Sequence, residues 1–175
     1  MSEKTIREEP LTAFLSGLGG DTGELYREIA SALAECGYAP KKAKSSISFK
    51  HGLHNKQIAK MGVRINKKDG AVPFFALRFS ACDNFSERFK NIVYSYVTKY
   101  PHRSSRCMDG GGCSFCAGDA ASHVYACALP DGETGFHCGA YAVEIPNVTL
   151  DDLDEIKSLI LEEHGYLMKH EAGRS

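Results

Sequence analysis

The sequence predicts a single α+β domain in which an antiparallel sheet of about five strands packs against helices. Helical and strand periodicities occur in the order helix, helix, three strands, helix, two strands, helix. Strands grouped in this way are typical of an antiparallel sheet rather than a doubly wound parallel one. The 175 residues, 43% of them hydrophobic, are enough for one core. We expect the domain over residues 21–168, between an N-terminal segment 1–20 and a frayed tail 169–175.

Two helices are expected before the first strand. The first is short, because its hydrophobic residues recur at helical spacing and stop at Gly19. These residues are Leu11, Phe14, Leu15 and Leu18. The second is expected to begin at Asp21, because Asp21 and Glu24 have the spacing of a capping box, and to end before Gly37.

Three segments alternate between hydrophobic and polar residues, as half-buried strands do: 46–50, 61–65 and 75–79. A turn sequence, Lys-Asp-Gly, lies at 68–70 between the second segment and the third. The pattern therefore predicts three strands of an antiparallel meander.

The strongest helical pattern follows, between Asp83, which is expected to cap the helix, and Pro101, which ends it. Its apolar residues form one continuous stripe rich in aromatic side chains. They are Phe85, Phe89, Ile92, Val93, Tyr96, Val97 and Tyr100. We expect this helix to pack across the sheet.

The last predicted elements are two strands and a helix. Segments 124–129 and 139–145 flank a Pro-Asp-Gly turn and predict a hairpin. Thr149 and Asp152 have the spacing of a capping box, which predicts a final helix that ends near Gly165.

A segment rich in glycine and cysteine, residues 102–121, separates the aromatic helix from this hairpin. Cys113 and Cys116 form a C-x2-C pair, and Cys107 precedes them across three glycines that let a short loop fold back. Cytosolic thiols stay reduced, so clustered cysteines indicate a metal site rather than disulfides. We therefore expect a structural zinc ion, which takes four cysteine or histidine ligands.

Cys138 is the predicted fourth ligand, because it is expected at the start of the returning strand, beside the cysteine segment. The neighbouring His137 is the alternative. Other interpretations of the same cysteines are an iron–sulfur cluster, a redox-active C-x2-C pair and unligated thiols. A zinc-pinned loop explains how about twenty residues without periodic structure stay ordered.

The segment from Lys41 to Lys68 holds nine Lys or Arg residues and no Asp or Glu. On the predicted strands its cations alternate with Ile47, Phe49, Met61, Val63 and Ile65, so they face away from the core. Such a face binds anions or nucleic acid, or it is solvated and guards a strand edge against aggregation. The candidate anion-binding residues are Lys50, Lys60, Arg64, Arg103 and Arg106.

Several functional classes lack a signature in the chain. No nucleophile elbow, P-loop, dinucleotide-binding glycine motif or HExxH zinc motif occurs, so no catalytic chemistry is predicted. No apolar stretch approaches the roughly 18 to 20 residues that a membrane span needs. Residues 1–10 are polar and acidic, unlike a secretory signal, and we therefore expect a cytoplasmic protein without a membrane partner.

The order of helix, two strands, third strand, helix and two further strands resembles the GyrI-like effector-binding superfamily over roughly residues 21–146. The resemblance is one of element order, and the cysteine segment departs from it. It implies a cleft between sheet and helix that binds small molecules, often cationic or aromatic ones.

Three functions are predicted, in order of preference. The first is a non-catalytic, zinc-stabilised module that binds a small-molecule ligand or regulates another protein. The second is a nucleic-acid-associated protein that uses the basic residues 41–68. The third is an enzyme of unknown chemistry.

Overall fold

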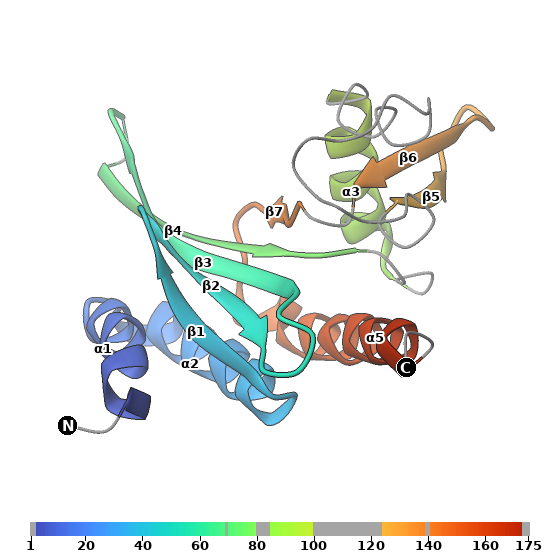
Figure 1. The fold of residues 1–175 in the computed structure, drawn as a ribbon. Coiled ribbons are helices and arrows are strands. Elements are labelled where there is room, and N and C mark those ends of the chain that lie inside the picture. Colours follow the sequence, from blue (N-terminus) through green and yellow to red (C-terminus); the bar gives the residue numbers. More distant parts are fainter. Residues whose placement is uncertain (1–2, 69, 80–84, 100–123, 139–140, 173–175) are drawn as a thin grey trace.

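The computed structural model describes residues 3–68, 70–79, 85–99, 124–138 and 141–172 (Figure 1). Within these residues, helices α2 and α5 lie on one side of an antiparallel five-stranded sheet. Helix α3 lies beside an edge strand of this sheet, next to a separate two-stranded sheet. The α+β class and the five-stranded antiparallel sheet are confirmed.

The first two helices are α1, Glu3–Ser16, and α2, Gly20–Glu35. Leu25, Ile29 and Leu33 of α2 are buried, and Gly37 follows the helix with a φ of 81°, as a C′ glycine does. The capping box predicted for Asp21 and Glu24 is wrong. Gly19 is the N-cap, and Asp21 already lies in the first turn, where its charge suits the positive end of the helix.

The five-stranded sheet has the order β1-β2-β3-β4-β7, and every neighbouring pair is antiparallel. Its strands are β1 Tyr38–Ala43, β2 Ser46–His51, β3 Gln57–Asn66, β4 Gly70–Leu77 and β7 Val143–Ile145. The predicted meander is confirmed as β2, β3 and β4. Strand β1 was not predicted, because Pro40 and the lysines after it interrupt the alternation.

The second sheet consists of β5, Val124–Ala128, and β6, Thr134–Cys138. The predicted pairing of 124–129 with 139–145 is therefore wrong. Gly132, at a φ of 85°, closes a tight turn in which the N–H of Leu129 donates to the carbonyl of Glu133, so pairing resumes at once. The later segment instead contributes β7, which pairs with β4.

Helix α5, Leu153–Ala172, follows a short 3-10 turn, η2, Leu150–Asp152. The predicted capping box is confirmed, since the N–H of Thr149 donates to a carboxylate oxygen of Asp152 at 3.0 Å. The predicted end near Gly165 is wrong. No residue near Gly165 has the positive φ that often ends a helix, so the helix continues into the residues that were predicted to form the tail.

Helix α3, Glu87–Lys99, buries Phe89, Val93 and Val97, and Asp83 lies outside the described residues. The helix does not pack across the sheet as predicted; it packs on β6 and on β7 at the sheet edge. Gly135 of β6 allows this approach, because a Cβ there would lie 2.8 Å from Cγ1 of Val97.

One arginine anchors α3 to the start of α5. The Nε of Arg88 donates to Asp152 at 2.9 Å, and its Nη2 donates to the carbonyls of Pro146 and Asn147. Asp152 therefore takes part in the capping box at η2, before α5, and also binds Arg88 of α3, which fixes α3 beside the sheet.

The far part of the β3–β4 hairpin extends beyond the covering helices (Figure 1). Val63 and Ile65, predicted to face the core, share the face of Met61 but are 38% and 91% exposed. Alternation predicts the face of the sheet on which a residue lies, but it does not show how far the helices cover that face.

Candidate functional site

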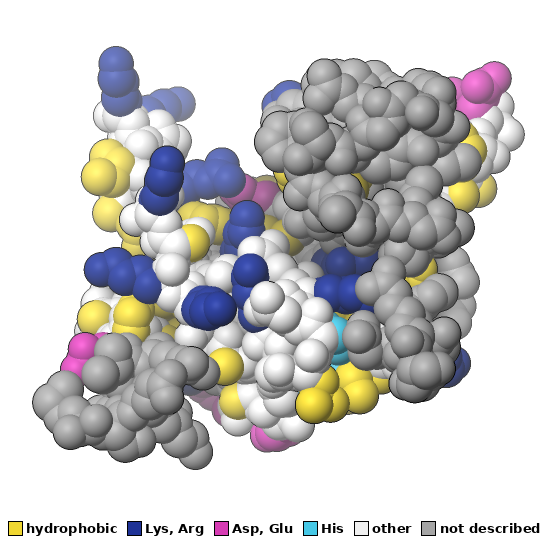
Figure 2. All heavy atoms as spheres, viewed as in Figure 1, with side chains coloured by type: hydrophobic (Ala, Val, Ile, Leu, Met, Phe, Trp, Pro, Cys, Tyr) yellow, Lys and Arg dark blue, Asp and Glu magenta, His cyan; other side chains and the backbone are white. Residues whose placement is uncertain are grey.

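The outer face of the sheet, the one turned away from α2 and α5, carries a row of paired residues that includes Lys41 and Lys60 and is called here the cation row. Ser48 pairs with Lys41 on one side and with Lys60 on the other, and the row continues through Ala76 to Glu144. Figure 2 shows Lys and Arg side chains spread over this face and along the β3–β4 hairpin. The prediction that Lys50, Lys60 and Arg64 face away from the buried residues of β2 and β3 is confirmed. Arg103 and Arg106 lie outside the described residues.

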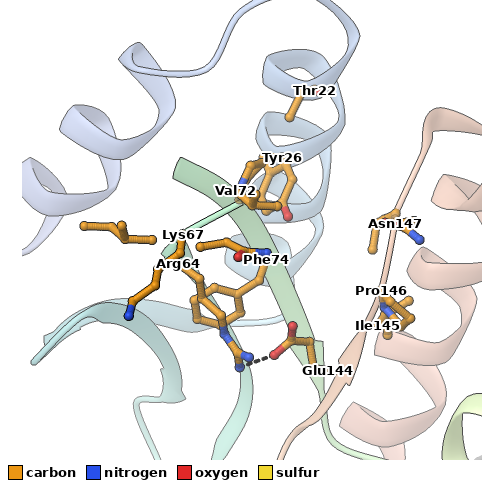
Figure 3. A pocket seen from close by; sticks show the side chains of 14 residues that line it. Thr22, Tyr26, Arg64, Lys67, Val72, Phe74, Glu144, Ile145, Pro146 and Asn147 are labelled. Carbon is orange, nitrogen blue, oxygen red and sulfur yellow. Dashed lines mark ion pairs between the residues drawn. The ribbon is translucent and has the colours of Figure 1, made fainter. Parts of the chain in front are cut away.

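An aromatic platform lies beside this row. Phe74 pairs with Gly62, and a Cβ on Gly62 would come within 3.1 Å of the Phe74 ring, so the ring lies over the glycine. The guanidinium of Arg64 stands 4.9 Å from the ring centroid, a cation–π contact. Arg64 also forms an ion pair with Glu144 of β7 (Figure 3).

A groove of about 770 Å³ runs between the outer face and α3. The lining of this groove, called here the sheet–helix groove, includes three cations and three aromatic side chains: Lys60, Arg64, Lys99, Phe74, Tyr96 and Tyr141. Among the described residues that line it, Glu144 is the only acid. The groove is therefore positively charged and has flat apolar surfaces.

A second groove adjoins the first at Arg64, Phe74 and Glu144 (Figure 3). It lies where β4 continues beyond β7, so that one edge of β4 is not covered by a strand of this sheet. Thr22 and Tyr26 of α2 line it. Burial, and then the charge of Glu144, raise the pKa of the Tyr26 hydroxyl, which therefore stays protonated.

Several residues of the grooves were not predicted. Phe74 had a signal, because it is an aromatic residue at an outward position, between Pro73 and the inward Phe75. Glu144, Tyr96 and Tyr141 had none, since they come from β7, α3 and the segment after β6. Only the fold brings them beside β3.

Of the predicted metal ligands, Cys107, Cys113 and Cys116 lie outside the described residues. Cys138 is buried at the end of β6, not at the start of a strand as predicted, and it pairs with Val124. Among the described residues, no group of three or more His, Cys, Asp or Glu side chains is arranged to hold a metal ion.

The alternative ligand, His137, has a ring engaged elsewhere. The ring is 2% exposed and stands edge-on to Tyr96 of α3, with 5.0 Å between centroids. Its Nε2 lies 3.3 Å from the carbonyl oxygen of Tyr141. Because neighbouring residues of a strand point to opposite faces, Cys138 points away from α3.

A cluster of histidines, not predicted as a group, surrounds Tyr38 at the other end of the sheet. The rings of His51 and His54 stack at 4.4 Å, and His164 of α5 lies 5.6 Å from His51. Nδ1 of His164 is 3.4 Å from the hydroxyl of Tyr38. Burial is the main cause that lowers the pKa of His164, and the nearby His51 lowers it further.

Two of these histidines hold the turn between β2 and β3. Nδ1 of His51 accepts the N–H of Leu53 at 3.2 Å, and Nδ1 of His54 accepts the N–H of Lys56 at 3.1 Å. Each Nδ1 needs its lone pair for this bond, so both turn contacts require that atom to be unprotonated.

Known proteins offer no guide to the function. Comparison with them finds no matching family model, no matching curated protein and no matching solved structure. In the part of the chain that the structure describes, no helix is both long and apolar enough to cross a membrane. The function must therefore be inferred from the grooves themselves.

Proposed function

We propose that the protein is a non-catalytic module that binds an organic anion with a flat apolar part in the sheet–helix groove. The observation that carries the proposal is the convergence of Lys60, Arg64 and Lys99 with three aromatic side chains. The volume of about 770 Å³ falls within the range of about 300 to 1,000 Å³ that is typical of small-molecule sites.

The charge of the groove selects the ligand. Three cations against one carboxylate favour an anion, in contrast to the cationic ligands that the GyrI-like resemblance implies. Phe74 presents a ring on the sheet surface, and a planar group that displaces the Arg64 guanidinium can stack on it while an acidic group reaches Lys60.

The proposal can be tested with 1-anilinonaphthalene-8-sulfonate, which joins a sulfonate to aromatic rings and fluoresces on apolar binding. Lys60→Gln is expected to weaken binding about tenfold, or roughly 1.4 kcal/mol, because it removes a cation from the groove. Phe74→Leu is expected to weaken it through the lost stacking surface.

Lys68→Gln, at the tip of the hairpin outside the groove, is the matched control and should bind the dye as the parent protein does. Near-ultraviolet circular dichroism shows whether each variant keeps its packing. Equal dye affinity in Lys60→Gln, Lys68→Gln and the parent protein would refute the proposal.

We also propose that a structural zinc ion on Cys107, Cys113, Cys116 and Cys138 stabilises the module. The pairing of Val124 with Cys138 supports the fourth ligand, because Val124 is the first described residue after the cysteine segment. The burial of Cys138 agrees with a closed structural site. The contacts of the His137 ring favour Cys138 over His137.

A further inference from the structure

The cation row on the outer face extends beyond the sheet–helix groove. Lys41 and Lys60 flank Ser48 on neighbouring strands, and Lys50 lies two residues beyond Ser48 on the same face. Within the part of the chain that the structure describes, none of these three lysines forms an ion pair. Their positive charge is therefore available to bind an anionic partner.

The cations of this face are spread over a distance larger than a single small anion. Strands lie about 4.8 Å apart, so Lys41 and Lys60 are separated by roughly 10 Å across β2. Lys60 and Arg64 are four residues apart on β3, which adds roughly 13 Å along the strand. Repeated negative charges along one chain match this spread better than one acidic group does.

The face also has a place for planar groups. Phe74 lies over Gly62 next to Lys60, and an incoming base can stack on its ring in place of the Arg64 guanidinium. Tyr96 and Tyr141 line the groove at the end of the row. Cations that track a backbone, combined with aromatic rings on which bases stack, are what single-stranded nucleic acid requires. A duplex keeps its bases paired inside and leaves such a ring unused.

The surface lies between two projections. The β3–β4 hairpin rises on one side of the outer face and α3 on the other (Figure 1). Lys67 and Lys68, in the turn between β3 and β4, and Lys99 of α3 add positive charge to both sides. A flexible strand can follow the outer face into the sheet–helix groove.

We propose that single-stranded nucleic acid binds across the outer face, with phosphates on Lys41, Lys50 and Lys60 and a base stacked on Phe74. This inference rests on the proposed function for the groove, which receives the stacked base. The lysines outside the groove are what it adds.

The test is fluorescence anisotropy of the full chain with a labelled oligo(dT) of about 12 nucleotides, a length within the range of single-strand binding sites. Titrations from about 50 to 200 mM KCl give the salt slope. Three phosphate contacts predict a slope of about −2, since each contact with a single strand adds about −0.7.

Lys41→Gln and Lys42→Gln are a matched pair, because the two residues are neighbours on β1 whose side chains point to opposite faces. Lys41→Gln should weaken binding and reduce the slope by about 0.7, whereas Lys42→Gln should change neither. Phe74→Leu should weaken binding at least about fivefold without changing the slope, and Phe74→Trp should retain it.

The inference is overturned by any one of three results: no binding at about 50 mM KCl, equal losses in Lys41→Gln and Lys42→Gln, or a duplex that binds as tightly as the strand. The dye separates the two proposals. If the dye binds and the strand does not, this inference fails and the proposed function stands; if neither binds, both fail.

Discussion

Arg78 and Glu163 form an ion pair inside the fold, with Nε of Arg78 2.8 Å from Oε1 of Glu163. Their side chains are 5% and 0% exposed. The pair joins the residue after β4 to the middle of α5, so it ties the sheet to the helix that covers it. Around it lie Tyr38 and Tyr166, whose pKa values are raised mainly by burial; the charge of Glu163 raises them further, and that of Arg78 lowers them.

Glu163→Gln is expected to lower the free energy of unfolding by about 3 to 5 kcal/mol, because the charge of Arg78 remains buried without its counter-charge. Urea denaturation followed by circular dichroism measures the loss. The double variant Arg78→Met with Glu163→Leu should recover much of it, since apolar residues of similar volume avoid both charges. Glu28→Gln, which breaks the exposed pair with Lys157, is the control and should leave the melting temperature unchanged. A loss of the same size in the control would contradict the interpretation.

The histidine cluster predicts how stability depends on pH. The pKa of His164 is lower in the folded chain than its ordinary value of about 6.5, so below that pH the unfolded chain binds more protons. The stabilising contribution is fully present above about pH 6.5 and is lost as the pH falls through the lower, folded pKa. Melting temperatures between about pH 7.5 and 5 should therefore decrease on the acid side.

His164→Gln should flatten this dependence, because glutamine keeps a polar group near the Tyr38 hydroxyl and has no titration in this range. Arg78 and Glu163, whose charges act on Tyr38 within the cluster, stay the same in this variant. Leu161→Gln, an exposed position on the same helix, is the control and should keep the parental slope. An unchanged slope in His164→Gln would exclude His164 as its source.

The zinc prediction is tested by elemental analysis of protein purified without added metal. About one zinc per chain is expected, and Cys113→Ser should lose it together with thermal stability. Cys138→Ala should also reduce occupancy, whereas Cys36→Ala, a half-buried thiol after α2, should not. Full occupancy in Cys138→Ala would show that the fourth ligand is another residue, and a brown protein would indicate iron–sulfur instead.

Gly62→Ala tests the aromatic platform. The added Cβ would lie 2.9 Å from the carbonyl oxygen of Ser45 and 3.1 Å from the Phe74 ring, so the ring must move. We expect a loss of about 1 to 3 kcal/mol in stability, typical of overpacking, and weaker binding of the dye. Gly52→Ala, where nothing lies within 4 Å of the new Cβ, should change neither quantity. Dye affinity that survives in Gly62→Ala would place the binding surface elsewhere.

Local patterns predicted the elements whose residues interact with near neighbours. The alternation around Phe49, Met61 and Phe75 predicted the meander because each strand buries one face. Thr149 and Asp152 predicted the start of the last helix because the capping box is complete within four residues.

The failures have an equally local cause. The predicted segment 139–145 contains β7, but β6 was missed, because Gly135 and His137 rather than hydrophobic residues occupy its face toward α3. Pro40 masks β1. The grooves and the histidine cluster were beyond prediction from local patterns, because their members meet only through strand order and helix packing. The helical pattern around His164 does not indicate its contact with Tyr38, because the two rings meet only when α5 packs against the sheet.

The ion pair between Arg64 and Glu144 has a consequence for any ligand of the groove. The guanidinium is already bound to a carboxylate, so an anion that approaches Arg64 has an internal competitor of the same charge. Glu144 lies at the centre of β7, between the buried Val143 and Ile145, and β7 connects the α3–β6 region to the main sheet. Displacing Glu144 would therefore transmit the arrival of a ligand to the strand at which the two parts of the fold meet.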